Sequence, residues 1–321
     1  MKNLIHVTPV RINLEILRQE VSLLQAAYNR IGTRETTEGR SAFSKWNNLN
    51  HFLTSVDNTS SEVVINVEGS SENNSCARIY YKPSITSLTK EVRKAIIPTK
   101  DSNKFLFFDL KAAEFFLFCY FAKQDSVVSA YLQGNDPYDA LSKFFPSNVE
   151  RNQYKTALIS SLYGGTSYSV SKRVGCTEAV ADRLLECVRR ATPDLENLKR
   201  RIISTALHKG TYAYPTKLDM SEYNRVPYKY ITKTKRVEFN PNHALSTFTQ
   251  SALGFWMQNL IKDILQEFRI EGTILSIFDS LLIECSPEQI PSLQTYLSER
   301  IKPFRTGKFT TGSTFYEAYV A

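Results

Sequence analysis

Residues 107–118 have the sequence FFDLKAAEFFLF, and this stretch is the most informative part of the chain for its fold. The four apolar residues 105–108 end in Asp109, which predicts a buried strand with a carboxylate at its mouth. Residues 113–123 are apolar almost throughout, which predicts a helix that is buried on most sides. The chain therefore places an acidic side chain directly at the edge of its expected core.

A second carboxylate lies at the tip of a predicted hairpin. Residues 274–278 and 281–283 are apolar and flank Asp279-Ser280, a two-residue connection that is typical of a tight turn. Two carboxylates at the ends of buried strands repel one another if they meet, unless cations bind between them. Two Mg²⁺ ions about 3.5–4 Å apart would satisfy such a pair and build a phosphoryl-transfer site. The alternative is that both residues have structural roles: Asp109 caps a turn, and Asp279 is an ordinary turn residue of the hairpin.

A third feature is a predicted helix over residues 148–163, which ends at two glycines. Four of its side chains lie at steps of four and form one stripe, because each step turns about 40° around the axis: Arg151, Lys155, Ile159 and Tyr163. Two cations and a terminal aromatic ring on one face suit a triphosphate followed by a base. The alternative is an ordinary amphipathic helix with exposed cations.

The charge of the 321-residue chain is unevenly distributed. Residues 151–240 contain 17 Lys and Arg against 8 Asp and Glu, a net charge of +9, whereas the whole chain has +8. A basic middle on a near-neutral body favours a polyanionic partner such as nucleic acid. A basic, merely solvated surface is the alternative.

The composition excludes several classes of protein. Apolar residues make up 42% of the chain, enough for a real core, so a disordered protein is excluded. The longest apolar run, residues 115–122, falls far short of the roughly 20 residues that span a bilayer, and no signal peptide is recognisable. Scattered cysteines and few histidines, without metal spacing, indicate a reduced cytoplasmic protein that lacks a zinc site.

The remaining pattern predicts an α+β fold, with helices around a small antiparallel sheet. Residues 57–75 are rich in Ser, Asn, Glu and Gly around a short strand at 63–67, and we expect a domain boundary there. Other expected elements are helices over residues 11–31, 42–56, 177–188, 194–209 and 243–268, helices beginning at Asp136-Pro137 and after Ser286, and a strand over 308–319.

Taken in order, these features resemble the polymerase domain of family A DNA polymerases, the bacterial Pol I group and its phage relatives. Residues 107–118 resemble motif A, D-Y-S-x-I-E-L-R. The resemblance implies that Asp109 binds metal and that Glu114 packs under the sugar and excludes a 2′-hydroxyl. Residues 131–145 resemble the stretch that follows motif A in the family.

Two further motifs follow at matching offsets. Residues 151–165, RNQYKTALISSLYGG, resemble motif B, which implies that Arg151 and Lys155 hold the triphosphate and that Tyr163 lies at the nascent base pair. Ile159 departs from the family, which has an aromatic residue there. Residues 276–284, SIFDSLLIE, resemble motif C; Asp279 keeps the metal-binding aspartate, while Phe278 and Ser280 replace the family's His and Glu.

Weaker matches extend the resemblance over residues 76–318. Gln250 falls where the family contacts the primer–template minor groove, and Arg78 and Arg93 lie in a stretch that resembles another nucleic-acid-binding run. By this resemblance we expect a right-hand polymerase fold, with an N-terminal reduced thumb-like region at 1–75, palm at 76–135, helical fingers at 136–240 and palm again at 241–321.

The implied activity is template-directed DNA synthesis from dNTPs on primer–template DNA, with two Mg²⁺ ions, which Mn²⁺ can replace, held by Asp109 and Asp279. An RNA-synthesising relative, such as a primase or single-subunit RNA polymerase, is the first alternative; Glu114 argues against it, whereas Ile159 and the altered motif C leave it open. A catalytically inactive nucleic-acid-binding subunit is the second. The small size and the degenerate motifs suggest a phage or mobile-element origin.

The N-terminal part is short for this family. Only about 75 residues precede the Arg78 stretch, and they contain no D-x-E motif of a proofreading exonuclease. The helix over residues 11–31 is either a reduced thumb or a docking helix. We therefore expect that a separate thumb, exonuclease or processivity subunit completes the enzyme.

Overall fold

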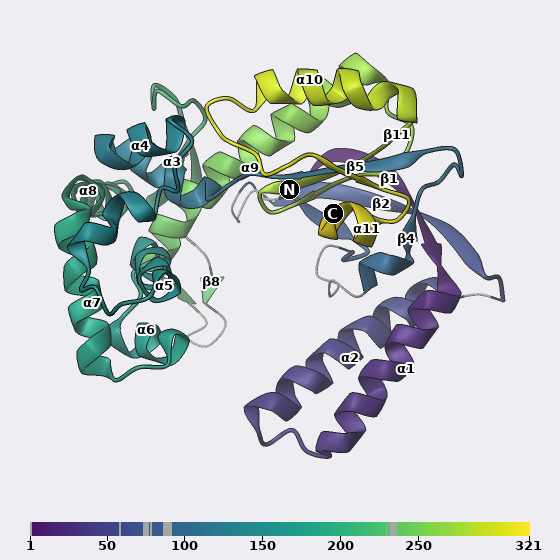
Figure 1. Ribbon diagram of the computed structural model, residues 1–321, viewed down its shortest axis with the longest axis horizontal. Coiled ribbons are helices and arrows are strands. Elements are labelled where there is room, and N and C mark those ends of the chain that lie inside the picture. The colour runs from purple at the N-terminus through teal and green to yellow at the C-terminus, as the bar shows by residue number, and fades with distance from the viewer. Residues whose placement is uncertain are drawn as a thin grey trace.

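The computed structural model describes residues 2–57, 59–72, 77, 79–85, 92–228, 230–231 and 236–321. Within these ranges, helices surround antiparallel sheets, so the predicted α+β class is confirmed (Figure 1). Of the predicted site residues, Arg78 lies outside the described part of the chain.

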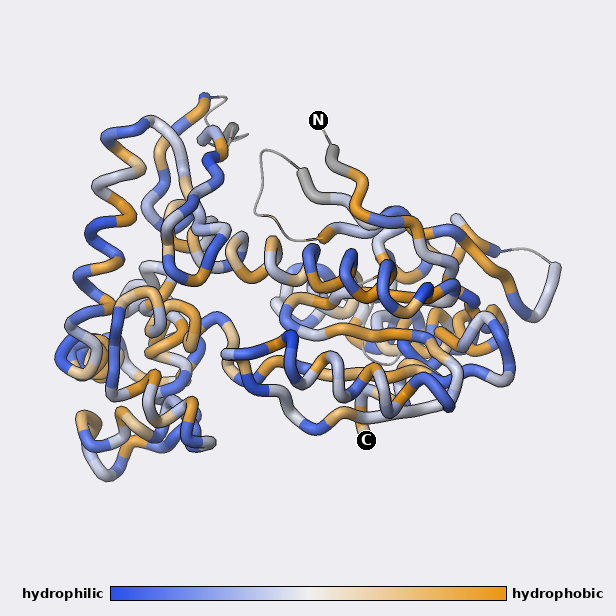
Figure 2. The backbone as a smooth tube through the Cα atoms, turned by 90° about the horizontal axis from the view of Figure 1, so that it is seen from above, coloured by the Kyte–Doolittle hydropathy of each residue, from blue (hydrophilic) through white to orange (hydrophobic). Residues whose placement is uncertain are grey.

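One four-stranded sheet carries both motif aspartates. Its order is β10-β11-β5-β12, and the strands are β10 (Ile274–Ile277), β11 (Ser280–Cys285), β5 (Lys104–Asp109) and β12 (Thr310–Gly312). All neighbours are antiparallel. Strand β5 is apolar without alternation because both of its faces are buried: Leu106 and Phe108 enter one core, Phe105 and Phe107 the other. Figure 2 shows long hydrophobic stretches along the strands.

A second four-stranded sheet, in the order β3-β2-β1-β4, covers one face of the first. It is formed by β1 (Lys2–Asn13), β2 (Glu62–Glu72), β3 (Tyr80–Lys82) and β4 (Ile96–Ile97). The predicted helix over residues 11–31 was therefore wrong at its start. Val10 and Ile12 alternate with polar neighbours and continue the strand, and the Asn13 side chain caps the helix by accepting from Ile16 N–H at 3.0 Å.

Two helices form a hairpin that projects from this sheet (Figure 1). They are α1 (Leu14–Ile31) and α2 (Thr37–Val56), joined after Gly32, whose left-handed φ of 71° ends α1. Near the tip, the rings of Tyr28 and Trp46 stack with their centroids 5.9 Å apart. The prediction of helices in this region is confirmed, with α2 beginning five residues earlier than expected.

The middle of the chain gathers beyond one end of the first sheet, at the left of Figure 1. It comprises α3 (Ala113–Ala122), α4 (Asp125–Leu132), α5 (Arg151–Leu162), α6 (Ser167–Val174), α7 (Glu178–Ala191) and α8 (Pro193–Lys209), with the hairpins β6 (Thr211–Pro215) to β7 (Tyr223–Pro227) and β8 (Tyr230–Ile231) to β9 (Arg236–Val237). Helix α3 is buried at eight of its ten residues, as predicted.

The long helix α9 (Pro241–Phe268) leads back to the sheet, followed by η3 (Pro287–Gln289), α10 (Ile290–Arg300) and α11 (Phe315–Val320); η1 (Val92–Ala95) precedes β4. Two predictions were wrong here and in the middle region. Residues 136–144 contain a 3₁₀ helix, η2 (Asp139–Phe144), in place of a longer helix. Residues 308–319 contain the short strand β12 and then α11, because Thr314 caps a helix by accepting from Glu317 N–H at 3.1 Å.

Strand β10 lies at the edge of the first sheet, where its outer backbone groups need partners. Side chains of the second sheet supply them. Thr8 Oγ1 accepts from Ile274 N–H at 2.8 Å, His6 Nε2 lies 3.1 Å from Ile274 O, and Tyr81 Oη accepts from Ser276 N–H at 2.7 Å. The two sheets are therefore joined by specific hydrogen bonds at the strand that leads to Asp279.

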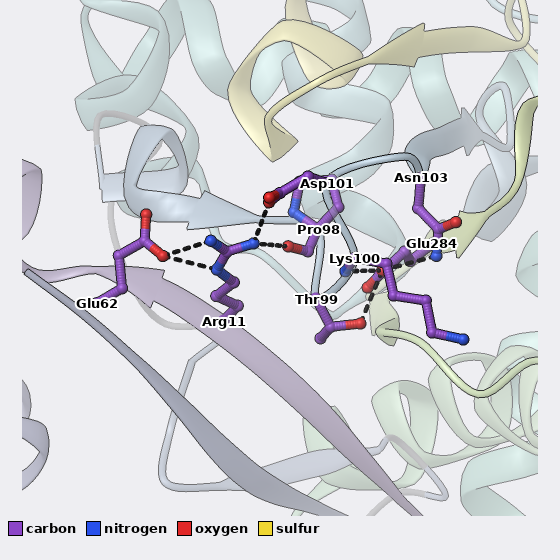
Figure 3. A network of polar contacts seen from close by, with 8 residues as sticks. All are labelled: Arg11, Glu62, Pro98, Thr99, Lys100, Asp101, Asn103 and Glu284. Carbon is purple, nitrogen blue, oxygen red and sulfur yellow. Dashed lines mark hydrogen bonds and ion pairs between the residues drawn. The ribbon is translucent and has the colours of Figure 1, made fainter.

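A polar network joins the same two sheets through residues 98–103 (Figure 3). On one side, Arg11 of β1 binds Asp101, Glu62 and the carbonyl oxygen of Pro98. On the other side, Glu284 on β11 is only 1% exposed. It accepts hydrogen bonds from these groups: Thr99 Oγ1 (2.8 Å), Asn103 Nδ2 (3.0 Å), Lys100 N–H (3.2 Å) and Thr273 N–H (2.9 Å). Burial raises the pKa of Glu284, but these donors outweigh it and hold the pKa below its usual value.

We predict that Glu284→Gln lowers the free energy of unfolding by about 2 kcal/mol at pH 7, because an amide cannot accept from donors on both sides. The folded-state pKa lies below the unfolded value, so the carboxylate stabilises the fold above the unfolded pKa of about 4.5 and loses this effect as the pH falls through the folded pKa. The difference between wild type and variant should therefore shrink in acid. Denaturant unfolding at several pH values measures it.

Glu271→Gln is the matched control, because Glu271 pairs with Lys100 at 3.0 Å on the surface and should contribute less than about 1 kcal/mol. Equal stability of the two variants at pH 7 would show that the network does not hold the sheets together.

Candidate active site

The two motif aspartates meet at one end of the first sheet. Asp109 is the last residue of β5 and pairs directly with Ser280, the first residue of β11. The N–H of Leu110 donates to the carbonyl oxygen of Asp279 at 3.0 Å, so Asp279, in the turn before β11, lies beside the end of β5. Both line one cavity of about 290 Å³. Asp109 is open to this cavity, yet partial desolvation raises the pKa of its carboxyl.

The turn between β10 and β11 differs in character from the buried strands. Phe278 is 62% exposed at the tip and has a φ of 60°, a left-handed conformation that is uncommon for a bulky residue. The Ser280 hydroxyl donates to the carbonyl oxygen of Ile277 at 2.7 Å. The Ser280 side chain therefore stabilises the turn, and Asp279 is the carboxylate that motif C contributes to the cavity.

Helix α5 faces the aspartates with the predicted stripe. Lys155 and Ile159 line the same cavity as Asp109 and Asp279. Arg151, one turn earlier, forms ion pairs with Asp136 and with Asp139, the latter at 3.2 Å. These carboxylates raise the pKa of the Arg151 guanidinium, Asp136 most strongly.

The ring of Tyr138 lies under both cations of the stripe. Its centroid is 5.2 Å from the Lys155 ammonium and 5.6 Å from the Arg151 guanidinium. The ring is itself stacked on Phe115 of α3, with centroids 4.8 Å apart. Tyr138 thus couples the stripe on α5 to the buried helix that follows Asp109.

Glu114 and Tyr163 form a pair. Helix α5 ends at Leu162, one residue before the predicted end, and the Tyr163 hydroxyl donates to the Glu114 carboxylate on α3. Glu114 lines the cavity of the aspartates and also a neighbouring cavity of about 320 Å³. Gln250 of α9 and Phe278 line that neighbour. The structure thus brings together eight predicted residues: Asp109, Glu114, Arg151, Lys155, Ile159, Tyr163, Gln250 and Asp279.

Arg93 does not join this group. Its guanidinium lies over the rings of Phe315 and Tyr319 of α11, 5.0 and 4.4 Å from their centroids. Among the described residues that line the cavities next to Asp109, Arg93 is not found. Its contact with nucleic acid stays a prediction, as does that of Arg78.

Sequence reasoning missed several residues of the site. Asp136, Tyr138 and Arg305 line a further cavity of about 420 Å³ beside Asp109, together with Arg151 and Lys155. The Asp136-Pro137 pair was interpreted only as a helix start. Arg305 lies in a segment without any motif, and its position depends on a backbone contact with residues 109–111.

Carboxylate oxygens are the ligands that Mg²⁺ prefers, and Asp109 and Asp279 present them side by side. Across the described ranges, no group of three or more His, Cys, Asp or Glu side chains is arranged to hold a metal ion. A divalent ion here would therefore take its remaining ligands from water and substrate. Likewise, no helix that the structure describes is long and apolar enough to cross a membrane.

Comparison with known structures shows what this arrangement is. The POL domain of Pol1 from M. smegmatis, in complex with DNA primer-template and dNTP, matches with a TM-score of 0.74 and 14% sequence identity, over 97% of this chain and 68% of that chain. At this identity the match shows a shared fold. The antiparallel sheet with carboxylates at one end, faced by a helix with cations, therefore has the fold of that POL domain.

The family follows from the sequence model of DNA polymerase family A, which matches residues 78–309. The chain belongs to DNA polymerase family A, and the predicted enzyme class, DNA-directed DNA polymerase, is confirmed at the level of the family. A comparison with curated proteins finds no matching sequence.

Proposed function

We propose that this chain is a template-directed DNA polymerase that adds dNTPs to a primer 3′-hydroxyl, with Asp109 and Asp279 holding two Mg²⁺ ions. The observation that carries the proposal is the pairing of Asp109 with Ser280, which places Asp279 beside it and opposite Lys155. In the reaction, the primer 3′-oxygen attacks the α-phosphorus and pyrophosphate leaves. When bound, the divalent ions would stabilise charge on the attacking and leaving oxygens.

The other residues bind and orient the substrate. Lys155 and Arg151 neutralise the triphosphate, and Arg151 exchanges its contact with Asp136 for a phosphate oxygen. Glu114, held by the Tyr163 hydroxyl, lies where a 2′-hydroxyl would be excluded. Ile159 keeps apolar bulk on the same helix face, and Gln250 contacts the primer–template minor groove.

Two observations support DNA as the partner: the positive charge of residues 151–240 and the structural similarity to a polymerase bound to DNA. Residues 151–240, with their net charge of +9, form most of the helical side that faces the aspartates. The M. smegmatis structure holds DNA primer-template and dNTP. Base pairing would supply the sequence choice, so this chain needs contacts to the nucleic-acid backbone rather than base readout.

The domain roles are part of the same proposal: fingers at 136–240, palm at 76–135 and 241–321, and a reduced thumb within 1–75. The projecting α1–α2 hairpin supports the thumb assignment. Strands β1 and β2 nevertheless pair with β3 and β4 across the proposed boundary, so the thumb itself would be the hairpin alone. A separate processivity or exonuclease subunit and an intracellular location complete the proposal.

We predict that Asp279→Ala lowers single-turnover dNTP incorporation at least about a thousandfold, because charge stabilisation by bound metal contributes several kcal/mol. Binding of the primer–template duplex should stay within a few-fold of wild type. Asp182→Ala, which removes an exposed carboxylate on α7, is the control and should retain activity. Equal inactivity of wild type and Asp279→Ala with both Mg²⁺ and Mn²⁺ would instead favour a binding subunit.

We predict that Glu114→Ala raises rNTP incorporation relative to dNTP by at least about tenfold, as expected when a steric exclusion is removed. Glu114→Gln keeps the bulk and should keep most of the discrimination. Incorporation of a single rNTP or dNTP opposite one template base measures the ratio. Preferential rNTP use by wild type would overturn the DNA polymerase assignment in favour of an RNA-synthesising relative.

A further inference from the structure

The cavity of about 420 Å³ beside Asp109 has an excess of positive charge. Its charged lining consists of four cations and two carboxylates: Lys111, Arg151, Lys155, Arg305, Asp109 and Asp136. A polar, open cavity with such an excess attracts anions. It lies on the α5 side of Asp109, where the leaving group of the proposed reaction must go.

Three of the four cations already have partners. Arg151 is bound by Asp136 and Asp139. Arg305 donates to the carbonyl oxygens of Tyr131 at 3.2 Å and Asn135 at 3.0 Å. The Lys155 ammonium lies over the ring of Tyr138. Carboxylates therefore offset the charge of Arg151, whereas Arg305 and Lys155 are held by neutral groups.

Lys111 differs from these three. Its side chain is exposed toward the cavity, and within the described part of the chain its ammonium forms no ion pair or hydrogen bond. Its position, two residues after Asp109, points it to the same cavity as the end of β5. An ammonium without an ion pair is available to bind an anion.

The backbone of Lys111 is nevertheless held firmly. Its N–H donates to the carbonyl oxygen of Arg305 at 2.8 Å, and its carbonyl oxygen accepts from the Tyr131 hydroxyl at 2.9 Å. The Tyr131 hydroxyl in turn accepts from Arg305 N–H at 2.7 Å, and Gly307 N–H donates to Asp109 O at 2.8 Å. The Lys111 backbone is thus fixed by hydrogen bonds, while its long side chain carries the ammonium close to Asp109 in the sequence.

We propose that Lys111 is a further anion-binding residue of this polymerase, which contacts the β- and γ-phosphates of the incoming nucleotide and the pyrophosphate product. The proposal rests on the proposed function and extends its set of substrate-binding residues. Asp136 and Asp139 neutralise Arg151 before substrate binds, so a second mobile ammonium is needed beside Lys155. Lysine supplies this as a point charge that can follow the phosphate as it leaves.

The test compares Lys111→Ala, Lys111→Arg and wild type. Lys111→Ala should raise the KM for dNTP and the inhibition constant for pyrophosphate about tenfold each, with a smaller change in kcat, and Lys111→Arg should recover most of both. Lys104→Ala is the matched control, because it removes an exposed lysine from the other end of β5. Thermal melting shows whether each variant is folded.

Inorganic tripolyphosphate provides a readout that does not need catalysis. Its binding, measured by calorimetry without DNA, should weaken in Lys111→Ala and not in Lys104→Ala. Unchanged KM, pyrophosphate inhibition and tripolyphosphate affinity in Lys111→Ala would overturn the proposal while leaving an active polymerase intact. An inactive wild type would overturn the proposed function, and the tripolyphosphate measurement would still decide the role of Lys111.

Discussion

The antiparallel pairing of β5 with β11 is the constraint on which the site depends. Its register places Asp109 opposite Ser280, and the hydrogen bond from Leu110 N–H to Asp279 O extends the pairing past the strand ends. A shift by one residue would turn Asp109 to the other face of the sheet and separate the carboxylates. The register is thus a chemical requirement as much as a structural one.

Burial and polar contacts together keep this register. Residues 105–108 are buried on both faces of the sheet, so sliding β5 would expose apolar surface or bury a charge. The edge strand β10 is held by His6, Thr8 and Tyr81, and the far end of β11 by the bonds to Glu284. These contacts stabilise the sheet and offset the unfavourable features at the site, which are the repelling carboxylates and the exposed Phe278. Functional sites commonly contain such destabilising features.

Sequence patterns predicted those parts of the fold and the site that depend on residues close together in the chain. The apolar run before Asp109, the hairpin around Asp279 and the four-residue stripe on α5 all follow from spacing, and the family motifs joined them. Strand β1 was misjudged at residues 11–13, because its alternation is short and a helix follows at once. Lys111 and Arg305 gave no signal: their roles arise from contacts between segments almost 200 residues apart, which spacing cannot show.

The central claim is that the two aspartates and the basic stripe form one template-directed site. The most direct measurement is single-nucleotide incorporation on four primer–templates that differ only in the template base, with each dNTP in turn and Mg²⁺ present. The account predicts that each template directs its complementary dNTP. Addition of the same nucleotide whatever the template base, or no addition on any template, would contradict it.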